Sequence, residues 1–144
     1  MKIYILFLLS LISCVLCSNE KKMSEFVRCA NDQVGKPYTE EDNRGPDKFS
    51  NSGLVWYCRG VAGLSTTSTI YVSWKDEKKP KVGAHVYGIT KINGPSVSSD
   101  ALGIVVATNP TIVVAGNKSK GILTRQLLKF TKEYLRVEYH FVDF

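Results

Sequence analysis

Few side chains in this sequence could carry out covalent chemistry, and those that could are widely spaced. Histidine, the most frequent general base, occurs only at His85 and His140. The thiol of Cys58 or the hydroxyl of Ser52 could serve as a nucleophile if a histidine activated it. Nothing in the spacing brings Cys58 to His85. A base could reach Ser52 in the first turn of an expected helix, but Ser52 is also an ordinary part of the motif around it. An amidase or peptidase that uses Cys58 or Ser52 with His85 is therefore an alternative that we rank below a binding role.

The N-terminus has the composition of an export signal. A short basic start precedes an apolar run, residues 3–16, that is too brief to span a bilayer comfortably. We expect a signal peptide over residues 1–17 and a single domain, without a membrane span, over residues 18–144. The protein would then be secreted, or lumenal or periplasmic. Lipid anchoring through Cys14 ranks second, because more apolar residues follow that cysteine where a polar tether would be expected.

Signal cleavage would leave two cysteines in the mature domain, Cys29 and Cys58. Two cysteines in an exported domain predict one disulfide, which would close a loop of about 30 residues and contribute on the order of 3 kcal/mol. Cys58 as a catalytic thiol is the competing interpretation. It follows Asn51 by two turns of an expected helix, about 10 Å along the axis, which is beyond the reach of the positive helix N-terminus. We therefore favour the disulfide.

The charge of the chain is moderately basic and is not clustered. There are 19 Lys and Arg against 13 Asp and Glu, so the net charge of +6 falls to +5 when Lys2 leaves with the signal. This balance suits anionic surfaces such as bacterial walls and is equally an ordinary solubility charge. The lysine-rich residues 75–81 include acids, and we expect a solvated loop there. The sequence predicts no nucleic-acid partner, no cofactor and no metal site.

Two helices are expected in the first half of the mature chain. Apolar residues recur at helical spacing over residues 23–34, and Gly35 supplies a stop. A turn-rich loop then leads to a second helix that begins near Ser50 or Asn51. Asparagine is among the best N-cap residues, so we expect Asn51 to cap this helix.

The remainder of the chain has the pattern of β-strands. A short strand or turn is expected around Ile70, with a loop from there to Pro80. Side chains alternate in the last segment and give one buried and one solvated face, with His140 on the solvated face. The expected strands cover residues 84–92, 102–108, 111–115, 122–130 and 135–142, and the period of residues 122–130 also fits a helix. Helices followed by an antiparallel meander of about five strands indicate an α+β fold.

Two motifs flank the polar loop that precedes the second helix. Gly35-Lys36-Pro37-Tyr38 comes before the loop, and Phe49-Ser50-Asn51-Ser52-Gly53-Leu54 follows it. This order resembles the NlpC/P-sixty family of papain-like cell-wall peptidases, whose pattern is G-K-P-Y, a glycine-rich loop and F-D-C-S-G-L. The resemblance implies an NlpC-type fold with N-terminal helices packed on an antiparallel sheet. It also implies that Asn51 occupies the position of the nucleophilic cysteine.

The other two catalytic positions implied by the resemblance are also replaced. Residues 100–105 resemble the family's H-V-G-I-Y strand, with Ala101 where the catalytic histidine belongs. The polar residue that orients this histidine falls near Val114 on the following strand. In a triad that acts as a unit, loss of the nucleophile or base alone costs about a million-fold in turnover. The resemblance thus implies a catalytically inactive relative with degenerate positions at Asn51, Ala101 and Val114.

A ligand groove is the feature that such a relative would retain. In the family the tyrosine of G-K-P-Y lines the cleft, and Tyr38 matches it. Asn51 and the backbone N–H groups of Ser52 and Gly53 would present donors that suit a carboxylate or a peptide carbonyl. We expect a monomeric pseudoenzyme that binds peptidoglycan-derived or other peptides, or a protein partner. A structural or host-interaction protein with a closed cleft is the other possibility, since the replaced positions on the strands are apolar.

One further motif is independent of the resemblance. Asn117-Lys118-Ser119 fits the acceptor pattern for N-linked glycans and lies in an expected turn. Asn117 is therefore a candidate glycosylation site for a chain exported by a eukaryotic cell.

Overall fold

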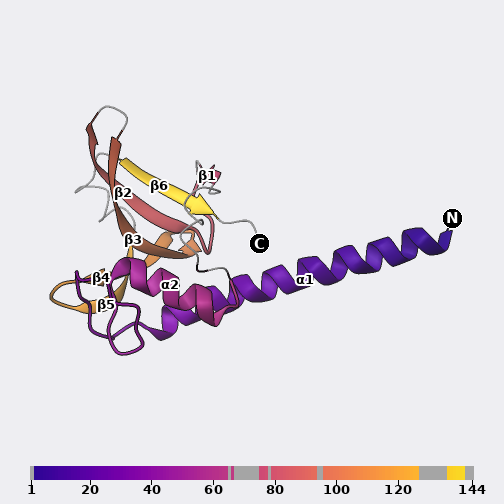
Figure 1. Ribbon diagram of the computed structural model, residues 1–144, viewed down its shortest axis with the longest axis horizontal. Helices are drawn as coiled ribbons and strands as arrows, with labels where there is room; N and C mark the ends of the chain where they lie inside the picture. The colour runs from indigo at the N-terminus through magenta and orange to yellow at the C-terminus, as the bar shows by residue number, and fades with distance from the viewer. Residues whose placement is uncertain are drawn as a thin grey trace.

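Two helices and one antiparallel sheet make up the described part of the protein. The computed structural model describes residues 2–64, 66, 75–77, 79–93, 96–126 and 136–141. The helices are α1 (Lys2–Asp32) and α2 (Asn51–Val61). The strands are β1 (Lys75–Glu77), β2 (His85–Asn93), β3 (Ser96–Thr108), β4 (Thr111–Asn117), β5 (Gly121–Gln126) and β6 (Arg136–Phe141). The helices pack on one side of the sheet (Figure 1), and the expectation of an α+β fold is confirmed.

The sheet of the described residues has six strands in the order β1-β6-β2-β3-β4-β5, where about five were expected. Strands were expected at the positions of β2, β3, β4 and β6. The described part of residues 122–130 forms β5, so it is a strand and not a helix. The expectation of a solvated loop over residues 75–81 is wrong for β1, which pairs with β6 from Lys75↔Phe141 to Glu77↔Tyr139. That partner comes from the far end of the chain, so a local charge pattern could not indicate it. The strand or turn expected around Ile70 lies outside the described residues.

Helix α1 is longer than the expected helix over residues 23–34. It runs from Lys2 through the predicted cleavage region to Asp32, and its N-terminal half extends away from the sheet (Figure 1). Its last turns pack against the rest of the domain through Phe26, Cys29 and Ala30. The chain then turns at Gly35, whose N–H donates to the carbonyl of Ile122 on β5 at 2.8 Å. No helix in the described ranges has both the length and the hydropathy needed to cross a membrane.

Hydrophobic side chains cover both faces of the sheet. On the helix side, Leu54 and Cys58 of α2 and the last turns of α1 bury Ile104 of β3 and Val114 of β4. The residues next to these in each strand point the other way, because side chains alternate across a sheet. They form a second cluster that consists of Ala84, Val86, Val105, Val113 and Ala115, with Val137 and Tyr139 packed against it. The alternation expected in the last strand is therefore confirmed for Val137 and Tyr139.

A disulfide joins the two helices inside the helix-side cluster. It links Cys29 of α1 to Cys58 of α2, with Cα atoms 5.4 Å apart, and both residues are buried. The predicted disulfide is thus confirmed. It fixes α2 against α1 and so holds the start of α2, where the family resemblance places the site, relative to the core.

Candidate functional site

Ser50 is the N-cap residue of α2. Its backbone is extended, with φ −82° and ψ 167°, and its Oγ accepts a hydrogen bond from the N–H of Gly53 at 3.0 Å. This satisfies one of the N–H groups that a helix start leaves without a partner. The expectation that Asn51 caps the helix was wrong by one residue. Asn51 is the first helical residue, and its side chain bonds to the sheet instead.

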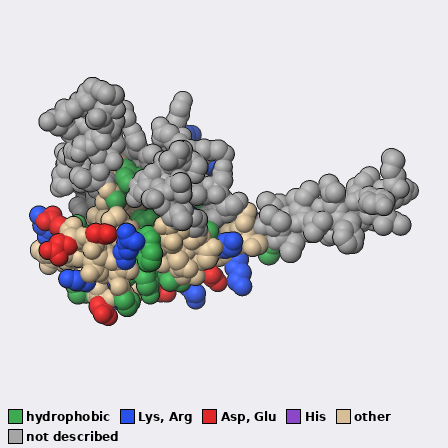
Figure 2. Space-filling view, in the orientation of Figure 1, with side chains coloured by type: hydrophobic (Ala, Val, Ile, Leu, Met, Phe, Trp, Pro, Cys, Tyr) green, Lys and Arg blue, Asp and Glu red, His purple; other side chains and the backbone are tan. Residues whose placement is uncertain are grey.

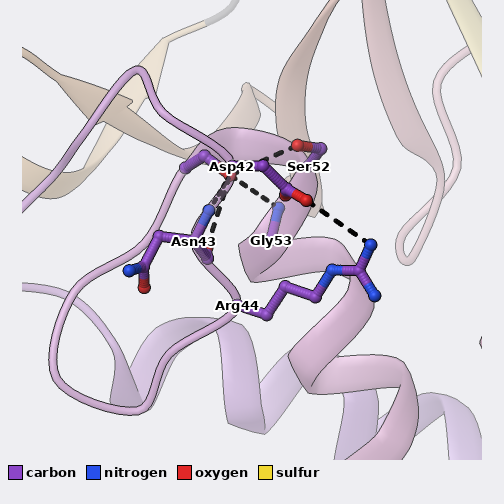
Figure 3. A network of polar contacts seen from close by, with 6 residues as sticks. Asp42, Asn43, Arg44, Ser52 and Gly53 are labelled. Atoms are coloured by element: carbon purple, nitrogen blue, oxygen red, sulfur yellow. Dashed lines mark hydrogen bonds and ion pairs between the residues drawn. The ribbon is translucent and has the colours of Figure 1, made fainter.

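The cap also fixes the loop that leads to α2 (Figure 3). The N–H of Ser50 donates to the carbonyl of Asn43 at 3.0 Å, and the N–H of Asn43 donates to Ser50 Oγ at 3.3 Å. The hydroxyl of Ser52 lies 3.2 Å from Ser50 Oγ in the same network. A Cβ atom on Gly53 would overlap the carbonyl oxygen of Asn43, so the loop and the helix approach closely only because residue 53 has no side chain. The helix start and the loop therefore form one hydrogen-bonded unit.

Asn51 connects the start of α2 to the sheet. Its Oδ1 accepts a hydrogen bond from the N–H of Gly116 on β4 at 2.7 Å. The ring of Tyr38 lies directly over Gly116, where a Cβ atom would overlap the ring. Tyr38 and Asn51, which the sequence placed in one cleft, thus meet at Gly116. Sequence reasoning missed Gly116, although a glycine inside a strand often marks a close approach of another group.

The backbone donors expected at the helix start are only partly available. Gly53 is buried, and its N–H donates to Ser50 Oγ. The expectation that this N–H would face a ligand is therefore wrong, because the cap uses it. Ser52 is exposed in the first turn. A ligand at this point would meet Ser52 and the ring of Tyr38, and not a row of open N–H groups.

The positions matched to the catalytic histidine and its orienting residue lie on two neighbouring strands. Ala101 is half-buried in β3 and is paired with Tyr87 of β2. Val114 of β4 is paired with Ile104 and is fully buried beneath the helices. A buried valine at this point packs α2 against the sheet. The assignment of Asn51, Ala101 and Val114 as former catalytic positions stays a prediction.

The alternative site based on Cys58 is excluded by the disulfide, because the sulfur is bonded to Cys29 and cannot act as a thiolate. His85 is 2% exposed, and its ring centroid lies 5.6 Å from that of Phe26 on α1. Its backbone is paired with that of His140 on β6, a proximity that sequence spacing did not indicate. The exposed Ser52 lies at the start of α2. The structure therefore encloses His85 beneath α1 and leaves Ser52 open to solvent.

A hollow lies in the loop beside the capping network. It has a volume of about 300 Å³ and is lined by Pro37, Asn43, Gly45, Asp47 and Lys48. Lys36 also contacts this loop, because its Nζ donates to the carbonyl of Pro46 at 2.8 Å. The sequence indicated a turn cluster here but not a hollow. Asn43 belongs to both the hollow and the capping network, so the two features adjoin.

Charged groups near the site are mostly at the surface, and Figure 2 shows Lys, Arg, Asp and Glu side chains spread over one face of the described part of the protein. Lys118 Nζ lies 2.6 Å from Glu40 in an exposed ion pair, and this hydrogen bond raises the pKa of Lys118. The guanidinium of Arg44 lies 4.9 Å from the ring centroid of Trp56 on α2. Arg59 of α2 is buried, and desolvation lowers its pKa, an effect partly opposed by Tyr87. The part of the chain that the structure describes contains no group of three or more His, Cys, Asp or Glu residues that could hold a metal ion.

Comparison with known proteins bears on the fold. No protein-family model matches the sequence, and no curated protein matches it. A solved structure from Staphylococcus aureus, described as similar to a lipoprotein of the NLP/P-sixty family, superposes with a TM-score of 0.58 and 16% sequence identity. The match covers 81% of this chain and 40% of that protein, so this chain spans less than half of its length. The chain therefore has a fold similar to that of an NlpC/P-sixty family protein.

Proposed function

We propose that this protein is an exported, catalytically inactive domain of NlpC type that binds peptides, with peptidoglycan stem peptides as the first candidates. The observation that carries the proposal is the position of Asn51. A carboxamide stands at the first residue of α2, where the resembling family has a cysteine, and its oxygen is held by Gly116 at 2.7 Å. An amide has no ionisable proton near neutral pH and cannot replace a thiolate. The chain would therefore recognise a peptide without cleaving it.

The hollow beside the capping network is the surface to which we assign the ligand. Its lining includes the carboxylate of Asp47 and the ammonium of Lys48, both on exposed residues. Stem peptides are short and carry free carboxylates and amines, so opposite charges could pair with these two side chains. Such exposed pairs contribute little energy each, roughly 0 to 1 kcal/mol. We therefore expect weak binding whose specificity depends on several contacts together.

A second function is favoured by the contact of Asn51 with Gly116. This hydrogen bond and the ring of Tyr38 over Gly116 fill the place where a substrate would approach the helix start. If no ligand displaces them, the former cleft is closed. The protein would then act through its outer surface, as a structural or host-interaction protein.

The first test asks whether the protein cleaves peptidoglycan. The chain is incubated with purified peptidoglycan fragments, and products are identified by mass spectrometry beside the Asn51→Cys/Ala101→His double variant. We expect no products from the wild type. New fragments from the wild type would overturn the proposal and direct attention to Ser52. Cleavage regained by the double variant would show that the cleft is open to the family's substrate.

The second test measures binding. Stem-peptide fragments are titrated into the protein, and backbone amide shifts are followed by NMR. The proposal expects shifts in the hollow, with affinity reduced in Tyr38→Ala, Asn51→Leu and Lys48→Ala, and unchanged in Arg28→Ala on the exposed face of α1. If no fragment shifts any residue of the hollow, the peptide-binding function fails and the closed cleft is favoured.

A further inference from the structure

The turn between β4 and β5 holds Asn117 in a distinctive arrangement. β4 ends at Asn117, β5 begins at Gly121, and the three residues between them are exposed. Asn117 Oδ1 accepts three hydrogen bonds, from Ser119 N at 3.0 Å, Ser119 Oγ at 2.9 Å and Lys120 N at 3.1 Å. Asparagine side chains often fold back on the following residues in this way at turns. Here the folded-back conformation coincides with the sequence Asn117-Lys118-Ser119.

These contacts leave the amide nitrogen of the Asn117 side chain without a hydrogen bond inside the turn. All three end on Oδ1, and none uses Nδ2, the atom to which an N-linked glycan is attached. The hydroxyl of Ser119 donates to the amide oxygen, which draws electron density away from the amide nitrogen and makes its N–H easier to deprotonate. All of the partners lie within three residues of Asn117, so the arrangement can form locally, before the sheet is complete.

A second asparagine provides an internal comparison. Asn109-Pro110-Thr111, in the turn between β3 and β4, has the same outer residue types, but a proline in the middle position excludes an acceptor site. In this turn the hydroxyl of Thr111 donates to the carbonyl of Thr108 at 3.4 Å and not to Asn109. Both asparagines lie at hairpin turns of the same sheet. Only Asn117 combines an acceptor triplet with a hydroxyl bonded to its amide oxygen.

We propose that Asn117 is an N-glycosylation site that is used when the chain enters a eukaryotic secretory lumen. The donor is an oligosaccharide linked to a lipid through pyrophosphate. A bond forms between Asn117 Nδ2 and C1 of the first sugar, and the bond from C1 to the pyrophosphate oxygen breaks. The lipid pyrophosphate leaves with the bonding electrons, and Nδ2 loses one proton to the transferring enzyme.

The modification is compatible with the site at the start of α2. Gly116 faces Tyr38, and side chains alternate along a strand, so residue 117 points away from Tyr38. A glycan on Asn117 would cover the exposed turn at Lys118, beside its ion pair with Glu40. The hydrogen bond between Asn51 and Gly116 would be left intact. The inference therefore does not depend on the proposed function.

The test is peptide mapping of secreted protein. The full chain is expressed in eukaryotic cells with a cleavable leader ahead of Met1, so that entry into the lumen does not depend on its own N-terminus. Protein from the medium is analysed by mass spectrometry before and after enzymatic deglycosylation, which converts a glycosylated asparagine to aspartate. We expect glycan on Asn117 in the wild type and in Ser119→Thr, and none on residue 117 in Asn117→Gln or Ser119→Ala.

A gain-of-site variant keeps the result interpretable. Pro110→Ala turns the triplet at Asn109 into an acceptor sequence in a comparable turn, and it shows whether the expressing cell modifies this protein at all. Glycan on Asn117 in the wild type, lost in Ser119→Ala, supports the proposal. Secreted wild-type protein with unmodified Asn117 overturns it, most clearly if Asn109 is modified in Pro110→Ala.

Discussion

Two adjacent residues at the start of α2, Ser50 and Asn51, bind different parts of the fold. Ser50 closes the helix end and ties it to Asn43, while Asn51 crosses to Gly116 on β4. Serine and aspartate both accept hydrogen bonds from a helix start, and Ser50 is the cap at a position where the pattern of the resembling family has aspartate. At residue 51 the chain has a carboxamide that accepts a hydrogen bond, where the pattern of the resembling family has a cysteine. The start of α2 is thus tied to the loop through Ser50 and to the sheet through Asn51.

The cap at Ser50 gives a prediction at the scale of one residue. Ser50→Ala removes the acceptor for the N–H of Gly53 and breaks two contacts with Asn43. Lost N-caps cost about 0.5–2 kcal/mol, so we expect the free energy of unfolding to fall by about that amount. Urea unfolding followed by circular dichroism measures this loss.

Two matched variants separate the cap from a general effect of substitution. Ser50→Asp keeps an acceptor at the cap position and should retain most of the stability. Ser52→Ala, two residues away and exposed, should change it by less than about 0.5 kcal/mol. A loss in Ser52→Ala equal to that in Ser50→Ala would contradict the assignment of Ser50 as the cap.

At the scale of elements, α2 and the preceding loop depend on a close backbone approach at Gly53. The same helix contains Gly60, which is exposed and whose nearest neighbour for an added Cβ would be Thr66 Cγ2 at 3.9 Å. The two glycines have the same intrinsic cost in a helix but very different surroundings. They therefore separate helix propensity from packing within one element.

We predict opposite effects of alanine at these two positions. Gly53→Ala forces the loop away from the helix start, because the new Cβ overlaps the carbonyl of Asn43, and should destabilise the domain by about 1–3 kcal/mol or more. Gly60→Ala should stabilise it by up to about 1 kcal/mol, since alanine is the better helix former. Thermal unfolding of both variants checks this. Equal shifts of the same sign would mean that the contact with Asn43 does not control the stability of α2.

Sequence reasoning succeeded where the determinants are local. The start of α2 near Ser50 or Asn51 and the turn at residues 109–110 follow from capping and turn preferences over a few residues. It failed where a partner is distant in the chain. β1 is a strand because of β6, and the role of Asn51 depends on Gly116, which is far along the sequence. No local pattern contains that information, so the start of α2 could be placed from the sequence but its contacts with β4 could not be derived.

At the scale of the whole molecule, the disulfide joins the two helices inside the cluster that packs them on the sheet. Cys29 and Cys58 lie in the cluster that packs α1 and α2 against Ile104 and Val114 of the sheet. The bond links residues 29 positions apart, so it restricts the unfolded chain as well as the helix pair. Its contribution should therefore appear in global unfolding and not only at the site.

We predict that reduction of this disulfide lowers the free energy of unfolding by about 3 kcal/mol. Denaturant titrations with and without reductant measure the loss in a Cys14→Ser/Cys17→Ser background, which leaves no cysteine in the chain besides Cys29 and Cys58. The matched control is the Cys29→Ala/Cys58→Ala variant. It should be insensitive to reductant and less stable than the reduced protein, because it also loses two buried sulfur atoms. Identical unfolding curves with and without reductant in the Cys14→Ser/Cys17→Ser protein would show that the bond between the helices does not stabilise the fold. The packing of α1 on α2 would then hold the start of α2 by itself.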